Sequence, residues 1–226
     1  MTEKKQIVLI YSVVAVVCSL IIGMSVWLAT LKKTNEELRP YAEDVGKVEV
    51  TEIMSLERDL DLVKQDGEAV KISDLKDKVW IATQFFAICP MCAERNGTRL
   101  LQVYDQFKDN PNFKVVCFSV DPESDTDEHL MSLETGLGVD GDKWWFVKTD
   151  PKKLRDYMRF EMLFGSVTER TDPREIDEKG KWAHDMGIQV YRGDTLLKKW
   201  HEGLPPEQLT ALVAKALEGL SEEGDE

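Results

Sequence analysis

The two cysteines of the run Cys89-Pro90-Met91-Cys92 are the residues of this sequence best suited to chemistry. An apolar run at 79–88 precedes them and predicts a buried strand, and the segment 93–107 that follows predicts a helix. The positive end of a helix dipole and its unpaired N–H groups stabilise a thiolate at such a junction. Two thiols at this spacing can close a disulfide or bind one soft metal ion. We therefore expect redox or soft-metal chemistry at Cys89 and Cys92.

The other sulfur-bearing residues have simpler interpretations. Cys18 lies in a long apolar segment and Cys117 in the apolar run 113–120, so both are expected to pack as small hydrophobic side chains. Half of a zinc site would need two more cysteine or histidine ligands at close spacing, and no second pair is present. A single vicinal pair is also too few for a disulfide-stapled scaffold. We interpret Met91 as a spacer or packing residue.

The elements that must position the pair alternate between strands and helices. Asp66-Gly67 predicts a tight hairpin turn, and Asp150-Pro151 predicts a helix N-terminus. The predicted elements are a hairpin at 61–72, strands at 79–86, 113–120 and 144–147, helices at 93–107, 125–134 and 151–164, a long polar loop at 165–182, a hairpin of 186–191 with 195–200, and a closing helix at 205–220. This order indicates an α/β fold, a thioredoxin-like mixed central sheet flanked by helices.

A histidine precedes the last hairpin, in the loop that faces the cysteine pair in a thioredoxin-like fold. The corresponding stretch, 181–187, contains no proline and offers His184. Two thiolates and one imidazole form a soft, low-coordinate ligand set that suits Cu(I) and can also accept Cu(II). We therefore predict Cys89, Cys92 and His184 as metal ligands. His129, on a predicted exposed helix, and His201, just after the last strand, are interpreted as ordinary surface residues.

The N-terminal segment 7–31 carries no charged residue and is rich in Val, Ile, Leu and Ala. As a helix it would reach about 37 Å, enough to cross a hydrocarbon core of about 30 Å. A cleaved signal peptide is the alternative, but its apolar core is usually shorter and ends at small residues. The predicted organisation is a cytoplasmic N-terminus at 1–6, a transmembrane anchor at 7–31, a tether at 32–59, the α/β domain at 60–220 and an acidic tail at 221–226.

The charge balance excludes one class of function. The chain has 226 residues and a formal net charge of −13. Such an acidic surface repels phosphate backbones, so we expect no nucleic-acid partner. The short N-terminus and retained anchor instead predict a single-pass protein of a bacterial inner (cytoplasmic) membrane, with its domain on the periplasmic or extracytoplasmic side.

Three stretches carry a resemblance to a known family: 85–92, 118–126 and 183–191, which read FFAICPMC, FSVDPESDT and AHDMGIQVY. With these the chain resembles the Sco (SCO1/SenC) family of membrane-anchored, thioredoxin-fold copper proteins. The resemblance implies that Cys89, Cys92 and His184 are copper ligands. It also implies delivery of copper to the binuclear copper centre of a respiratory cytochrome c oxidase, or reduction of the cysteines of that subunit before it is metallated.

One departure from the family keeps two functions open. The usual pair of the family is CxxxC, whereas this chain has CxxC, which is closer to the redox-active pairs of thioredoxins. The first hypothesis is a copper-binding assembly factor whose partner is the copper-centre subunit of cytochrome c oxidase. The second is an enzyme, an extracytoplasmic thiol–disulfide oxidoreductase that acts on the cysteines of another thiol protein, with Cys89 attacking and Cys92 resolving. Thr83 and Arg95 do not form a convincing peroxidase site, and a purely structural tethered domain is the alternative of a different class.

Overall fold

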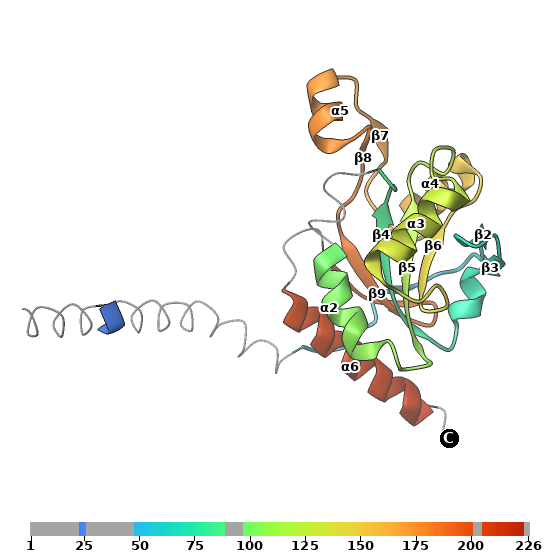
Figure 1. Cartoon of the computed structure of the whole chain (residues 1–226). Coiled ribbons are helices and arrows are strands. Elements are labelled where there is room, and N and C mark those ends of the chain that lie inside the picture. The colour runs from blue at the N-terminus through green and yellow to red at the C-terminus, as the bar shows by residue number, and fades with distance from the viewer. Residues whose placement is uncertain (1–22, 26–47, 89–96, 201–204, 224–226) are drawn as a thin grey trace, which may run out of the picture. The chain divides into compact units, whose positions relative to one another are not determined.

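The computed structural model describes residues 23–25, 48–88, 97–200 and 205–223 (Figure 1). The chain divides into two compact units, Met1–Lys47 and Val48–Glu226. In the first unit residues 23–25 are helical, and the rest of the predicted anchor at 7–31 lies outside the described residues. Within the described ranges, no helix has both the length and the apolar character needed to span a bilayer. The anchor therefore stays a prediction.

The second unit is built on a mixed, six-stranded sheet with the order β1-β10-β9-β4-β5-β6. The central strand β4 (Val79–Phe85) pairs in parallel with β5 (Phe113–Ser119), which pairs in parallel with β6 (Trp144–Val147). On its other side β4 pairs antiparallel with β9 (Ile188–Arg192), followed by β10 (Thr195–Trp200) and the short β1 (Met54–Ser55). The predicted mixed central sheet is confirmed.

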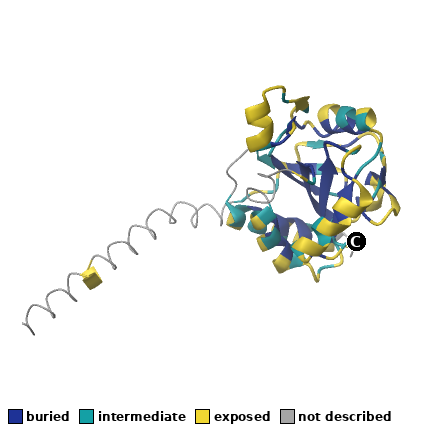
Figure 2. Cartoon of the chain, turned by 45° about the horizontal axis from the view of Figure 1, so that its top comes forward, coloured by how far each residue is buried: buried dark blue, intermediate teal, exposed yellow. Residues whose placement is uncertain are grey.

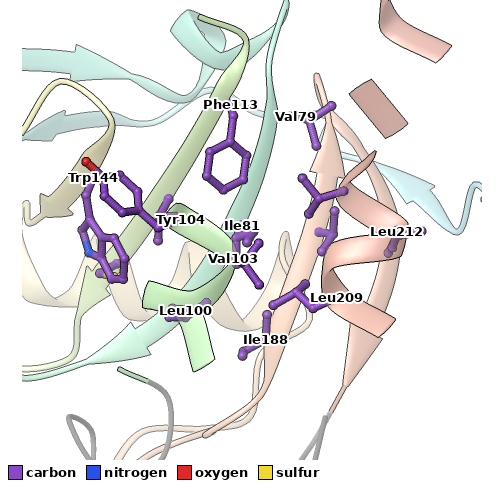
Figure 3. Close-up of a cluster of buried hydrophobic side chains, with 14 of the residues drawn as sticks. Val79, Ile81, Leu100, Val103, Tyr104, Phe113, Trp144, Ile188, Leu209 and Leu212 are labelled. Carbon is purple, nitrogen blue, oxygen red and sulfur yellow. The ribbon is translucent and has the colours of Figure 1, made fainter. Parts of the chain in front are cut away.

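Two hydrophobic cores cover the two faces of this sheet, because successive side chains of a strand point to opposite faces. Val79 and Ile81 of β4 belong to the first core, whereas Trp80 and Ala82 belong to the second. The first core is completed by α2 (Thr98–Phe107), α3 (Asp127–Leu137) and α6 (Pro206–Glu223), as Figure 3 shows for α2 and α6. The second is completed by α4 (Pro151–Phe160). Figure 2 shows the resulting burial of the central strands.

Several predicted elements are confirmed with small shifts. The first hairpin consists of β2 (Asp61–Val63) and β3 (Ala69–Lys71), with Gly67 at a φ of 84° in the turn, and a short 3₁₀ helix, η1 (Ile72–Leu75), follows it. Asp150 caps α4 as predicted, accepting a hydrogen bond from the Lys153 N–H at 2.9 Å. The helix itself ends at Phe160 rather than at 164.

Two predictions about the chain outside these elements are wrong. The folded unit begins at Val48 rather than near Leu60, because β1 pairs with β10 and Leu56 is buried in the second core. The segment 165–182, predicted as a loop, contains β7 (Thr168–Glu169), α5 (Pro173–Lys179) and the start of β8 (Trp182–Ala183). No residue of α5 is buried, so hydrophobic periodicity gave no sign of this helix.

Candidate metal centre

The structure places one of the three predicted ligands. His184 follows β8 and is partly buried, whereas Cys89 and Cys92, like Met91 and His201, lie outside the described residues. Within the described part of the chain, no three His, Cys, Asp or Glu side chains are grouped so that they could hold a metal ion. The three-ligand site therefore stays a prediction, and the described residues that bear on it are His184 and the strand that leads to Cys89.

His184 lies beside the end of that strand. Its ring meets the ring of Phe86 edge-on, with the centroids 5.6 Å apart and the planes at 80°. Phe86 directly follows β4 and is separated from Cys89 only by Ala87 and Ile88. The imidazole thus lies next to the point where the chain continues toward the cysteine pair.

The hydrogen bond of His184 defines its tautomer. Nδ1 is 3.0 Å from the carbonyl oxygen of Asp185. Because a carbonyl oxygen can only accept, Nδ1 carries the proton, and in the neutral ring Nε2 carries the lone pair. Burial lowers the pKa of His184, and the positive charge of nearby Arg170 acts in the same direction. A metal ion needs this neutral imidazole as its ligand.

The carboxylate of Asp185 holds the histidine loop in shape. It accepts hydrogen bonds from the Gly165 and Gly187 N–H groups, both at 2.8 Å, and lies 3.2 Å from the Lys199 ammonium. Burial opposes ionisation of Asp185, but the two N–H groups and Lys199 outweigh it, so the pKa of this carboxyl is lowered. Charge-assisted hydrogen bonds of this kind are among the stronger ones in proteins.

Two polar residues tie this loop to β4. The side-chain oxygen of Gln84 accepts a hydrogen bond from the Asp185 N–H at 2.9 Å, and the Thr83 hydroxyl donates to the Gly187 carbonyl oxygen at 3.2 Å. Both side chains are buried in a strand that is otherwise apolar. The strand that leads to the cysteine pair therefore also holds the loop that carries His184.

Arg170 and Trp182 shape the chain just before His184. The Arg170 guanidinium donates to the carbonyl oxygens of Lys179 at 3.2 Å, of Gly180 at 2.9 Å, and of Trp182. The Arg155 guanidinium lies 4.4 Å above the Trp182 ring, a cation–π contact that joins α4 to β8. The polar stretch preceding the histidine is thus folded against the domain.

The supporting roles of Thr83, Gln84 and Arg170 were not predicted from the sequence. The one sign available was the polar pair Thr83-Gln84 inside an apolar strand, since a buried polar side chain needs a partner. Two simpler predictions are confirmed. Cys117 is a buried free thiol in the first core, and burial raises its pKa to about 12. His129 is exposed on α3.

Known proteins share the sequence family and the fold of this chain. Residues 49–216 match the family described as SCO1/SenC. The "SCO1 protein homolog" of Bacillus subtilis (strain 168) is 29% identical over 84 residues, which is 37% of this chain and 44% of that protein. This alignment therefore spans less than half of the length of the curated relative.

Two solved structures share the fold at low identity. Arabidopsis thaliana ScoI with copper bound has a TM-score of 0.61 and 19% identity, over 73% of this chain and 99% of that chain. BsSco, described as a member of the Sco family of cytochrome c oxidase assembly proteins with a disulfide switch, has a TM-score of 0.59 and 19% identity, over 74% of this chain and 95% of that chain.

Proposed function

Because this chain belongs to the SCO1/SenC family, we propose that it binds copper through Cys89, Cys92 and His184 and serves the assembly of a cytochrome c oxidase copper centre. The observation that carries the proposal is the position of His184 against Phe86, at the end of the strand that leads to Cys89. Copper-bound ScoI and the membership of BsSco in a family of cytochrome c oxidase assembly proteins support the same function.

The chemistry of these residues suits copper as cargo. Two thiolates and one neutral imidazole form a soft set of few ligands, which Cu(I) prefers and Cu(II) can accept. The protein contributes a histidine whose Nδ1 proton is engaged by the Asp185 carbonyl, so that Nε2 carries the lone pair. The lowered pKa of His184 keeps the ring neutral at pH values near 7.

The proposed setting is a membrane surface. The uncharged segment 7–31 would anchor the chain in a bacterial inner membrane, with the unit that begins at Val48 on the extracytoplasmic side. The partner would be the copper-centre subunit of the oxidase, or another extracytoplasmic protein with reactive cysteines.

Thiol–disulfide exchange is the second candidate, and the CxxC spacing favours it. The Cys89 thiolate would attack a partner disulfide, forming a mixed disulfide and releasing one partner thiolate. The Cys92 thiolate would then attack the Cys89 sulfur, closing Cys89–Cys92 and releasing the reduced partner. Each round oxidises one dithiol and reduces one disulfide, so an external reductant must restore Cys89 and Cys92.

An anaerobic Cu(I) competition titration tests the first candidate. The reduced full chain in detergent is compared with His184→Ala, and with His129→Ala as the matched control, because His129 is exposed on α3. We expect tight one-to-one binding that weakens in His184→Ala and is unchanged in His129→Ala. Binding that is weak, or indifferent to His184, would reject the three-ligand site.

A trapping experiment tests the second candidate. In Cys92→Ser the resolving thiol is absent, so a mixed disulfide formed by Cys89 should persist. We expect a covalent adduct on non-reducing gels from membranes, which disappears on reduction and is absent from the Cys89→Ser/Cys92→Ser double variant. The absence of any Cys89-dependent adduct would count against the exchange reaction.

A further inference from the structure

A buried carboxyl group binds the chain just before the cysteine pair. Asp125 is 1% exposed, and its Oδ1 accepts a hydrogen bond from the Ala87 N–H at 2.9 Å. Its Oδ2 accepts a second one from the Ser119 hydroxyl at 2.5 Å. Only Ile88 separates Ala87 from Cys89, so this contact holds the backbone two positions before the pair.

Asp125 also joins the ends of the three parallel strands. Ala87 follows β4 and Ser119 ends β5, while Lys148, which follows β6, donates to the Asp125 carbonyl oxygen at 3.0 Å. The Asp125 N–H in turn donates to the Asp121 carbonyl oxygen at 2.9 Å. Ligands of open α/β sheets bind at this carboxyl edge of the strands.

The end of β4 is therefore held from two sides. The sheet order places β4 between β9 and β5. On the β9 side, Thr83 and Gln84 bind the loop that carries His184. On the β5 side, Asp125 binds Ala87. Burying a carboxyl group is unfavourable, as the raised pKa of Asp125 reflects, so its hydrogen bonds must compensate for this burial.

We propose that Asp125 is a positioning residue of the copper site: by accepting hydrogen bonds from Ala87 and Ser119, it directs the chain that leaves β4 and so places Cys89 and Cys92 relative to His184. This inference rests on the proposed function, because it concerns how that ligand set is held. The role belongs to the acceptor oxygens, and Asp125 itself does not act as a ligand.

Two substitutions separate the effect of the hydrogen-bond acceptors of Asp125 from the effect of its charge. Asp125→Ala removes both acceptors. Asp125→Asn keeps an oxygen for the Ala87 N–H, and its NH₂ group can donate to the Ser119 hydroxyl, which is able to accept as well as donate. Asp150→Ala serves as the control for stability, because it also removes a carboxylate that accepts a backbone N–H, at the start of α4.

The expected result is a Cu(I) dissociation constant raised about tenfold in Asp125→Ala, which corresponds to about 1.4 kcal/mol. Asp125→Asn and Asp150→Ala should stay within about threefold of the unsubstituted chain. In a His184→Ala background, Asp125→Ala should have little further effect, because the placement of the pair relative to the histidine no longer matters. Equal effects in both backgrounds, an Asp125→Asn that behaves like Asp125→Ala, or no effect at all would overturn the proposal.

A measurement without copper keeps this inference separate from the proposed function. We expect the Ala87 amide to exchange with deuterium faster in Asp125→Ala than in Asp125→Asn, because only the alanine variant lacks the acceptor. If the unsubstituted chain shows no His184-dependent copper binding, the proposed function fails, whatever the exchange result. If it binds copper through His184 but Ala87 exchange is the same in all variants, the positioning role of Asp125 fails instead.

Discussion

Asp185→Asn is the substitution that most directly tests how the histidine loop is held. An amide has one acceptor oxygen, so one of the N–H groups of Gly165 and Gly187 would lose its carboxylate partner at 2.8 Å. The ion pair with Lys199 would be lost as well. Both side chains of this pair are largely buried, with 9% of Asp185 and 16% of Lys199 exposed, so water can compensate only in part.

The expected loss of stability is about 2–4 kcal/mol. Losing a charge-assisted hydrogen bond at a buried group costs about 1.5–3 kcal/mol. The ion pair adds about 1 kcal/mol, because the cost of desolvating the two largely buried charges offsets most of their attraction and Lys199 still donates to the Leu163 carbonyl oxygen. For a unit of this size, the midpoint of thermal unfolding should fall by about 5–15 °C. Circular dichroism of the full chain in detergent at pH 7 measures this midpoint.

Two control variants make the result specific. Asp156→Asn breaks an exposed ion pair with Lys152 on α4 and should change stability by no more than about 0.5 kcal/mol. Lys199→Met leaves both backbone hydrogen bonds of Asp185 in place, so its midpoint of thermal unfolding should lie between those of Asp185→Asn and Asp156→Asn. A midpoint for Asp185→Asn that equals that of Asp156→Asn would refute the conclusion that the Asp185 carboxylate holds this loop.

Three further predictions concern groups with shifted pKa values. Burial opposes ionisation of Glu161, but its hydrogen bonds from Arg58 and the Glu57 N–H outweigh burial and lower its pKa. The carboxylate therefore stabilises the fold above its pKa in the unfolded chain, about 4.3, and this stabilisation is lost as the pH falls through its lower pKa in the folded chain. Acid unfolding of Glu161→Gln should therefore depend less on pH in this range, and an unchanged pH profile would contradict the assignment. The ring of His184 should titrate below about 6.5 in NMR spectra of the copper-free chain, and a midpoint above that value would contradict its burial. Cys117 should resist alkylation by iodoacetamide at pH 8 until the chain is unfolded, as mass spectrometry can show, and rapid labelling of the folded chain would be inconsistent with the buried thiol.

The central strands could be predicted because their pattern is local. The run from Val79 to Phe85 is buried on both faces, and its apolar composition indicates a central strand next to parallel neighbours. Turn and cap residues were equally informative, as with Asp66-Gly67 and Asp150-Pro151. These features depend only on residues that are neighbours in the chain.

The elements that were missed lack such a pattern. β1 has two residues, too few for an alternation to appear. α5 buries none of its residues, so it has no apolar face. Its cap could nevertheless have been found, because Asp172-Pro173 repeats the Asp150-Pro151 pattern that correctly predicted α4.

The candidate site could likewise be predicted only in part. The spacing of Cys89 and Cys92 is visible in the sequence, whereas the placement of His184 depends on β9 lying beside β4. The hydrogen bond from the Asp185 N–H to Gln84 joins residues 101 positions apart, a contact that no local pattern predicts. Only the presence of Thr83 and Gln84 within an apolar strand indicates that polar groups from elsewhere in the chain must hydrogen-bond to their side chains.

This arrangement gives a physical reason why the shortened cysteine motif need not abolish copper binding. Among the described residues, Asp185 holds the histidine loop in shape and Gln84 ties it to β4. On the other side of β4, Asp125 holds Ala87 independently of that spacing. None of these described supports includes a residue between the cysteines, so we expect the shorter motif to leave them in place and to change only the relation between the two sulfurs. We then expect the balance between copper binding and disulfide exchange to depend on the distance and orientation of the Cys89 and Cys92 sulfurs. The titration measures the copper binding, and the trapping experiment measures the disulfide exchange.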